Sequence, residues 1–213
     1  MLHNHLRNLN NLSRIERCPG MFAYERQTVA EHSFKVLQYA QFFGNLEAMK
    51  GINVDFKVLY EKVLNHDVSE ILIGDIPTPV KYKTPEMRQM VGEVEEMLVD
   101  EYIAEVVPEE FKELMGQWLA EGKDDTVEGN ILKFADKLDQ LYEAFEELQK
   151  GNTNYRYIRM YKNALAYLCS LKDVLPNTFE YFHKEILGGI IKEHVFVCNL
   201  REITEEVLET VNL

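Results

Sequence analysis

The sequence has few cysteines and no long apolar run, and each shortage excludes a class of protein. The three cysteines among 213 residues, Cys18, Cys169 and Cys198, are far apart and outside any CxxC pair. They predict neither a disulfide framework nor a thiolate zinc site, which is typical of a reducing compartment. The first residues contain no uninterrupted apolar stretch of the signal-peptide kind, and no later stretch reaches membrane-spanning length. We therefore expect a soluble, cytoplasmic protein with no membrane partner.

Basic residues are also scarce relative to acidic ones. The 23 lysines and arginines face 36 aspartates and glutamates, which gives a formal net charge of −13. Such a surface repels the backbone of nucleic acids and removes the counterion release that drives their binding. Nucleic acid is therefore not expected as a bulk partner. The acidic run from Glu93 to Glu113 has its charges at helical spacing around apolar residues, which predicts a solvated helix face.

Alternating runs of β-branched residues are scarce, whereas apolar residues three and four positions apart fill most of the chain. The predicted fold class is all-α, and the length predicts one domain over residues 1–213. Thr28 is expected to cap a helix, and the segment GDIPTPVKYKTPEM is expected to be a loop because proline disrupts a helix interior. The expected helices cover about residues 3–16, 28–46, 55–72, 86–105, 108–121, 125–150, 154–172 and 176–211. The last two are separated near Pro176, and the final helix could kink at Gly188-Gly189.

Ionisable residues occupy the apolar faces of two of these helices. His32 falls on the apolar stripe of its helix and is predicted to point inward. In the next helix the core-facing stripe changes from apolar residues to His66, Asp67 and Glu70. A single inward histidine is usually a satisfied core residue. A buried carboxylate beside buried imidazoles must be paired, hydrogen-bonded or metal-bound, however, and one divalent cation satisfies several such groups. The combination favours a metal site.

A further acid comes from the segment NILKFADKLDQLYEAF, where two aspartates compete. Asp139 lies closer to the centre of the apolar face of this helix, and Asp136 lies at its margin. Spacing slightly favours Asp139 and does not decide between the two.

The pattern H…HD…D, with an alanine before the last acid, resembles the HD-domain metal-dependent phosphohydrolases. The segments RIERCPGM, TVAEHS, NHDVSEILIGDIPTPVKY and KFADKLDQL resemble successive motifs of the bacterial 5′-deoxynucleotidase branch over roughly residues 1–150. The resemblance implies a single-domain helical bundle of the HD-domain type, with the metal site within residues 28–140. It also implies a homodimer, and the helices of residues 154–211, aromatic after Tyr155, would complete the bundle or form the dimer surface.

The resemblance also implies a role for individual residues. The metal ligands it implies are His32, His66, Asp67 and Asp136. Asp136 is preferred to Asp139 on this ground alone, and Asp139 is kept as a residue that could orient a ligand.

Other residues would act on the substrate. The resemblance implies that Glu70 handles a proton and that Arg17 orients the phosphate. Either Glu70 or Asp75 could protonate the departing oxygen, and Lys81 could assist with the phosphate. The segment that would contact the sugar and phosphate consists of Asp75, Ile76, Pro77 and Thr78.

The implied activity is hydrolysis of (deoxy)nucleoside 5′-monophosphates to nucleoside and phosphate. Two histidines and two carboxylates suit one divalent transition-metal cation, namely Mn²⁺, Co²⁺, Fe²⁺, Ni²⁺ or Zn²⁺. A pyrophosphohydrolase of nucleoside polyphosphates or alarmones is the first alternative, disfavoured because few extra cations are present to receive a longer phosphate tail. A catalytically silent metal-binding or nucleotide-sensing module is the second, disfavoured because Glu70, Arg17 and the GDIPTP segment are intact.

The chain departs from the pattern at one position. Better-known deoxynucleotidases of this branch have tryptophan after the arginine, whereas Cys18 follows Arg17 here. An indole can crowd a ribose 2′-hydroxyl. The smaller cysteine therefore predicts weaker rejection of ribonucleotides.

Overall fold

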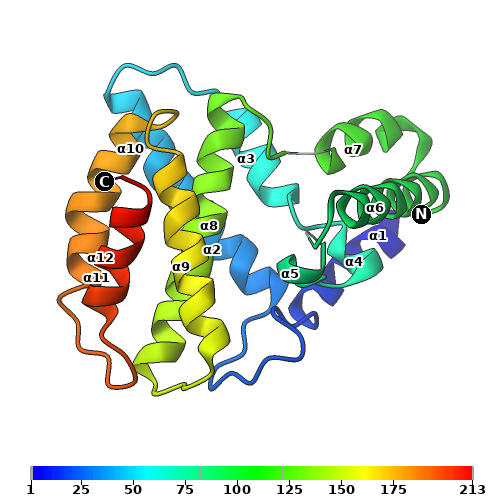
Figure 1. Ribbon diagram of the computed structural model, residues 1–213. Helices are drawn as coiled ribbons and strands as arrows, with labels where there is room; N and C mark the ends of the chain where they lie inside the picture. Colours follow the sequence, from blue (N-terminus) through cyan, green and yellow to red (C-terminus); the bar gives the residue numbers. More distant parts are fainter. Residues whose placement is uncertain (1, 82, 121, 213) are drawn as a thin grey trace. The chain divides into compact units, whose positions relative to one another are not determined.

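The computed structural model describes residues 2–81, 83–120 and 122–212, and the side chains of Thr78 and Pro79 lie outside this description. Helices provide the regular structure of these residues (Figure 1), and one isolated antiparallel bridge joins Glu16 to Thr28. The all-α prediction is confirmed. None of the described helices combines the length and the apolar composition needed to cross a membrane.

The helical segments, including short 3₁₀ and π turns marked η, have the following bounds: α1 (Leu2–Leu9), η1 (Asn10–Ser13), α2 (Val29–Met49), α3 (Phe56–Asn65), α4 (Glu70–Ile73), α5 (Thr78–Lys81), α6 (Pro85–Val106), η2 (Glu109–Phe111), α7 (Lys112–Leu119), α8 (Val127–Gln149), α9 (Tyr155–Ser170), α10 (Pro176–Tyr181), η3 (Phe182–Leu187), α11 (Gly188–Ile190) and α12 (Leu200–Thr210). The chain divides into two compact units, each described by itself: Met1–Met21, Arg26–Phe34 and Glu61–Gly122 form the first, and Phe22–Glu25, Lys35–Tyr60 and Lys123–Leu213 form the second. The single-domain expectation stays a prediction.

In the first unit, α6 is the helix on which the others pack. It begins at Pro85, where a missing N–H leaves no helix hydrogen bond unmade, and the Thr84 side chain caps it by accepting a hydrogen bond from the Met87 N–H. The helices α1, α4, α5 and α7 all contact α6. A buried hydrogen bond of 2.8 Å between His5 Nδ1 and Tyr102 Oη joins α1 to α6.

In the second unit, α9 packs along α8, and α12 packs on α9 (Figure 1). The rings of Phe43, Phe134 and Phe182 meet edge to face and connect α2, α8 and η3. The core is apolar, and its fully buried members include Val36, Ala40, Leu59, Ile131, Leu132, Ala135, Leu141, Leu148, Leu165 and Leu168.

Two buried glutamates fasten chain segments within the second unit. Glu47, near the end of α2, accepts hydrogen bonds from the Thr178 N–H at 2.9 Å, the Thr178 hydroxyl at 2.6 Å and Asn177 Nδ2 at 2.8 Å. These donors lie in the first turn of α10, where a negative charge also interacts favourably with the helix dipole. Glu47 therefore holds the start of α10 against α2.

Glu147, near the end of α8, holds the loop of residues 22–25. Its carboxylate accepts hydrogen bonds from the N–H groups of Tyr24 and Glu25, both at 2.9 Å, and from Asn152 Nδ2 at 2.7 Å. The backbone of this loop is fastened although the side chains of Phe22 and Tyr24 are 61% and 59% exposed.

The predicted helix over residues 55–72 is wrong in its last third. The helix α3 ends at Asn65, α4 begins at Glu70, and a turn of residues 66–69 separates them. In this turn the Val63 carbonyl accepts a hydrogen bond of 2.7 Å from His66 Nδ1, whereas a continuing helix would pair this carbonyl with the Asp67 N–H.

Other expected boundaries also shift. The segment predicted as a loop contains the single turn α5, and α6 starts within it because proline is tolerated in a first turn. The expected helix of residues 3–16 ends at Leu9 and continues as η1, since asparagine and serine compete with helical hydrogen bonds. The expected helix of residues 176–211 is interrupted by η3 and by the non-helical residues 191–199.

Candidate metal centre

His32 enters the site from the first turn of α2. A reciprocal pair of hydrogen bonds caps this helix: Thr28 Oγ1 accepts from the Glu31 N–H at 3.3 Å, and Glu31 Oε2 accepts from the Thr28 N–H at 2.7 Å. The prediction that Thr28 caps α2 is confirmed. His32 itself is fully buried, as its place on the apolar stripe predicted.

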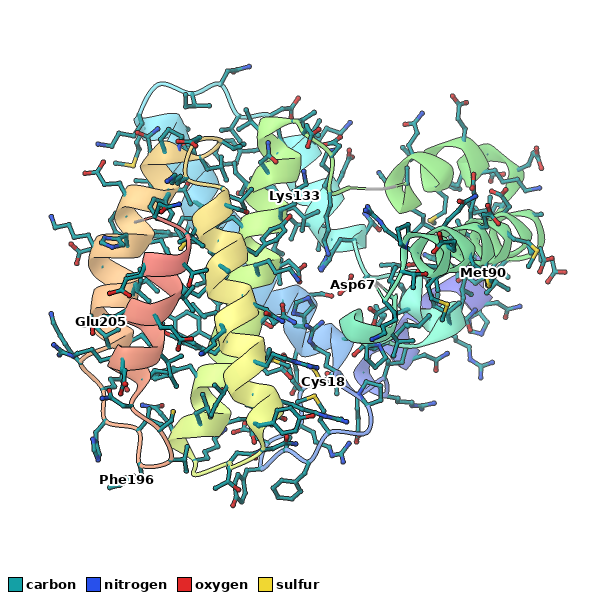
Figure 2. The ribbon with its side chains drawn as sticks, in the orientation of Figure 1. Cys18, Asp67, Met90, Lys133, Phe196 and Glu205 are labelled. Atoms are coloured by element: carbon teal, nitrogen blue, oxygen red, sulfur yellow. The ribbon has the colours of Figure 1, made fainter. Side chains whose placement is uncertain are left out.

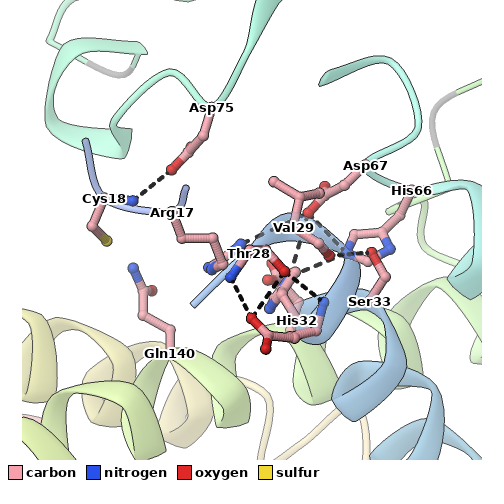
Figure 3. Close-up of polar contacts among 12 residues, drawn as sticks. Arg17, Cys18, Thr28, Val29, His32, Ser33, His66, Asp67, Asp75 and Gln140 are labelled. Atoms are coloured by element: carbon pink, nitrogen blue, oxygen red, sulfur yellow. Dashed lines mark hydrogen bonds and ion pairs between the residues drawn. The ribbon is translucent and has the colours of Figure 1, made fainter. Parts of the chain in front are cut away.

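His66 and Asp67 enter from the turn between α3 and α4. Because the Val63 carbonyl can only accept, His66 Nδ1 carries the proton of their hydrogen bond, which leaves Nε2 with a lone pair in the neutral ring. His66 Nε2 lies 3.3 Å from His32 Nε2, and Asp67 Oδ2 lies 3.3 Å from His32 Nε2 and 3.2 Å from His66 Nε2 (Figure 3).

This donor set fits one divalent cation. Bonds of about 2.0–2.1 Å to nitrogen or oxygen place neighbouring ligand atoms roughly 2.8–3.4 Å apart, with the shorter separations in octahedral and the longer ones in tetrahedral coordination. The three separations in the first unit fall in this range. Two imidazole nitrogens and a carboxylate oxygen converging with their lone pairs are stable together when a proton or a cation lies among them.

Glu70, the first residue of α4, lies next to this cluster. Its Oε2 atom is buried and has no hydrogen-bond partner among the described residues. Burial, and then the negative charges of Asp67 and Asp75, raise the pKa of Glu70 to about 8, against the opposing influence of Arg17 and His32. In the metal-free protein the Glu70 carboxyl group therefore holds its proton at neutral pH. A bound cation lowers the pKa of Glu70 again.

Arg17 brings a guanidinium group to the same place. Its Nη1 lies 3.8 Å from Asp67 Oδ2, and its side chain is largely buried. Its backbone N–H donates to the Gln27 carbonyl at 2.9 Å. The next residue, Cys18, has a φ of +51°, and its N–H donates to Asp75 Oδ2 at 2.7 Å (Figure 3). Asp75 therefore fastens the chain after α4 to the segment that carries Arg17.

The remaining predicted substrate contacts lie in or beside α5. Ile76 and Pro77 are half-buried in the non-helical segment before it, and Thr78 begins it, although the Thr78 side chain lies outside the described residues. Lys81 donates to Glu95 Oε1 at 2.6 Å. Their contact with a substrate stays a prediction.

Asp136 and Asp139 lie on α8 in the second unit. Asp139 is 0% exposed and Asp136 is 8% exposed, which agrees with the expectation that Asp139 lies closer to the centre of the apolar face. Asp136 Oδ2 accepts from Lys123 Nζ at 2.8 Å, and Asp139 Oδ1 lies 4.0 Å from Lys35 Nζ. The metal-ligand group that the structure brings together is formed by His32, His66 and Asp67. Asp136 as a fourth ligand stays a prediction.

Sequence and structure comparisons find close relatives. A family model described as 5′-deoxynucleotidase YfbR-like matches residues 4–190. A 5′-deoxynucleotidase of Photorhabdus laumondii is 30% identical over 201 residues, which cover 93% of this chain and 95% of the relative. The 5′-deoxynucleotidase YfbR of Escherichia coli is 31% identical over 148 residues, which cover 69% and 74%.

A solved structure extends the likeness to the fold. The crystal structure of an HD-domain phosphohydrolase from Listeria innocua is 44% identical to this chain, covers 98% of both chains and superposes with a TM-score of 0.92. The predicted all-α HD-domain fold is thereby confirmed.

Proposed function

The chain belongs to the 5′-deoxynucleotidase YfbR-like family and is a metal-dependent phosphohydrolase, and we propose that it hydrolyses nucleoside 5′-monophosphates to a nucleoside and inorganic phosphate. The observation that carries this proposal is the convergence of two imidazole nitrogens and one carboxylate oxygen within 3.3 Å of one another. A guanidinium group and a buried carboxyl group lie next to these atoms.

In this proposal the cation is held by His32, His66 and Asp67, with Asp136 as the fourth ligand. The mixed nitrogen and oxygen donors favour Mn²⁺, Co²⁺, Fe²⁺, Ni²⁺ or Zn²⁺. When bound, the cation polarises the phosphate and lowers the pKa of water, which supplies the nucleophile.

Arg17 binds the phosphate of the substrate. Its guanidinium is planar and permanently charged, and it can donate two parallel hydrogen bonds to phosphate oxygens. The neighbouring Asp67 holds it beside the metal ligands. On a surface with a net charge of −13, this cation marks where a small anion is received.

Glu70 supplies a proton to the leaving group. When the bond between phosphorus and the 5′-oxygen breaks, that oxygen leaves with the electron pair and must gain a proton. The Glu70 carboxyl group lies beside the proposed metal ligands, and its buried Oε2 atom has no hydrogen-bond partner among the described residues, which supports this role. Asp75 already accepts a hydrogen bond from the Cys18 N–H, which supports a role in positioning Cys18 and Arg17.

Position 18 is proposed to set the choice of sugar. A cysteine side chain is much smaller than an indole and crowds a ribose 2′-hydroxyl less, so we expect the enzyme to accept both deoxyribonucleoside and ribonucleoside monophosphates. Cys18→Trp is expected to lower kcat/KM for AMP more than for dAMP, because a clash acts on the excluded substrate. The positive φ of Cys18 disfavours any L residue, so Cys18→Phe serves as a control of similar strain and intermediate bulk. Strong rejection of AMP by the wild type would show that position 18 does not decide between ribose and deoxyribose.

A monophosphate is preferred to a polyphosphate because Lys81, a cation that could receive a longer tail, donates to Glu95. We also propose a homodimer, on the resemblance alone, which sedimentation of the purified protein tests.

Released phosphate tests the proposed function. The protein is stripped with a chelator, reloaded separately with each of the five metals, and incubated with dAMP, AMP, dTMP, ATP and a guanosine alarmone. We expect inorganic phosphate from the monophosphates, and none from the His66→Ala variant. Pyrophosphate from ATP or the alarmone would establish the first alternative. Metal binding without release of phosphate from any nucleotide would establish the sensor module.

A further inference from the structure

The segment that carries Arg17 is hydrogen-bonded to the residues that begin α2. The Arg17 N–H donates to the Gln27 carbonyl at 2.9 Å, and the Val29 N–H donates to the Ile15 carbonyl at 3.0 Å. Between these bonds Glu16 and Thr28 form the antiparallel bridge. The backbone position of Arg17 therefore depends on the backbone of residues 27–29, which lie in the same unit.

Glu31 fixes the conformation of Thr28 at the centre of this pairing. Its Oε2 atom accepts from the Thr28 N–H at 2.7 Å and from the Thr28 hydroxyl at 2.9 Å, while its own N–H donates to Thr28 Oγ1 at 3.3 Å. The Thr28 backbone is thus held from the helix side by Glu31 and from the other side by the bridge to Glu16.

We call the pairing of residues 15–17 with residues 27–29 the Thr28 joint, and both active-site groups lie close to it in the chain. His32 follows Glu31 directly, and its own N–H donates to the Thr28 carbonyl at 3.0 Å. Arg17 follows Glu16, the bridge partner of Thr28. A shift of Thr28 therefore moves the phosphate-binding arginine relative to the metal-binding histidine, which weakens the binding of a phosphate that needs both groups in place.

We propose that Glu31 is a positioning residue of the enzyme, which holds Arg17 in register with His32 through the Thr28 joint. The proposal rests on the proposed function for the role of Arg17. In this role Glu31 acts through the backbone of Thr28, whereas the loss of an ordinary helix cap affects stability alone.

Three single variants separate positioning from capping. Glu31→Ala removes both hydrogen bonds to the carboxylate, whereas Glu31→Gln keeps an acceptor oxygen, which capping boxes also use. Glu16→Gln is the matched control, because it removes only the exposed ion pair of Glu16 with Arg26 on the same two segments. For dAMP we expect Glu31→Ala to raise KM about tenfold with a smaller change in kcat. Both other variants should stay within about twofold of the wild type.

A double-mutant cycle tests whether the effect passes through Arg17. In an Arg17→Lys background, which lacks the guanidinium fork, Glu31→Ala should change KM by about twofold or less. A tenfold rise in KM that persists in that background would overturn the proposal, as would a loss in melting temperature with an unchanged KM.

Amide exchange tests the joint without relying on activity. By NMR, the amides of Arg17 and Val29 should exchange faster in Glu31→Ala and at the wild-type rate in Glu31→Gln. Unchanged exchange of both amides in Glu31→Ala would overturn the proposal. If the wild type hydrolyses no nucleotide while these amides respond as expected, the proposed function fails and the joint stands.

Discussion

His66 uses both of its ring nitrogens, and this double use explains its place in the site. Nδ1 donates to the Val63 carbonyl, which fixes the tautomer and ends α3, and Nε2 points toward His32 and Asp67. Hydrogen bonds of this kind on the outer nitrogen of a ligating histidine orient the ring and raise its basicity. In the proposed metal site, the loss of His66 therefore removes a ligand together with the contact that positions it.

The first prediction concerns the two residues of this turn. His66→Ala and Asp67→Ala should each reduce bound metal to well below one equivalent and abolish phosphate release, because one donor of the converging set is removed. Elemental analysis after gel filtration measures the metal. Lys81→Ala, which breaks an ion pair in the same unit, should keep its metal. Stoichiometric metal in both variants of the turn would refute the site.

The second prediction concerns Glu70. Glu70→Gln should keep the metal and the fold but lose about 10²–10⁴-fold in kcat, because the amide preserves the shape and cannot transfer a proton. Near wild-type turnover would show that a group other than Glu70 supplies the proton.

The metal-free protein gives a pH test of the same residue. The pKa of Glu70 is raised from 4.5 to about 8, so the folded protein binds a proton more tightly than the unfolded chain. Its contribution to stability is complete below pH 4.5 and is lost as the pH rises through 8. Chemical denaturation at pH values between 4.5 and 8 should show that the free energy of unfolding of the wild type declines as the pH rises. The decline should be smaller in Glu70→Gln.

At the scale of helices and loops, the buried carboxylates of Glu47 and Glu147 hold distant chain segments together through hydrogen bonds. In the third prediction, Glu47→Ala should lower the free energy of unfolding by roughly 2–4 kcal/mol, because the donors of Thr178 and Asn177 lose their acceptor in a buried position. Glu47→Gln, which keeps one acceptor, should cost less. Urea denaturation measures both, and Glu209→Gln at the exposed end of α12 should change the free energy little.

The sequence predicts features that depend on neighbouring residues and misses those that depend on distant ones. The cap of α2 was predictable because Thr28 and Glu31 stand three positions apart in a known capping pattern. The break after Asn65 was not predicted, since it depends on which carbonyl the His66 ring reaches. Glu47 and Glu147 read like ordinary solvated acids of amphipathic helices, because most of their partners are more than one hundred residues away in the chain.

The same limit applies within the site. The inward direction of His32 followed from helical spacing, and the structure agrees. Spacing favoured Asp139 for burial, which the structure also shows, but burial does not identify a metal ligand. That choice came from the resemblance to the HD-domain family.

For the whole molecule, we expect metal binding to be coupled to folding. The fourth prediction is that the cation raises the free energy of unfolding by about 2.7 kcal/mol when its free concentration is one hundred times its dissociation constant. Unfolding monitored with and without chelator measures this difference. The His66→Ala variant should show a much smaller response to metal, and an equal response in both proteins would place the bound ion elsewhere.

The fastening of residues 22–25 by Glu147 also has a consequence for proteolysis. Chymotrypsin cleaves after aromatic residues, but it must draw several residues of backbone into its cleft in an extended form, so a segment must detach locally before it is cut. Phe22 and Tyr24 offer exposed rings on a backbone that Glu147 and Asn152 hold down. Phe196 is 85% exposed in the non-helical residues 191–199 (Figure 2). The first nick should therefore fall after Phe196, and in Glu147→Ala the cleavage after Phe22 or Tyr24 should accelerate until it competes, which mass spectrometry of the early fragments would reveal.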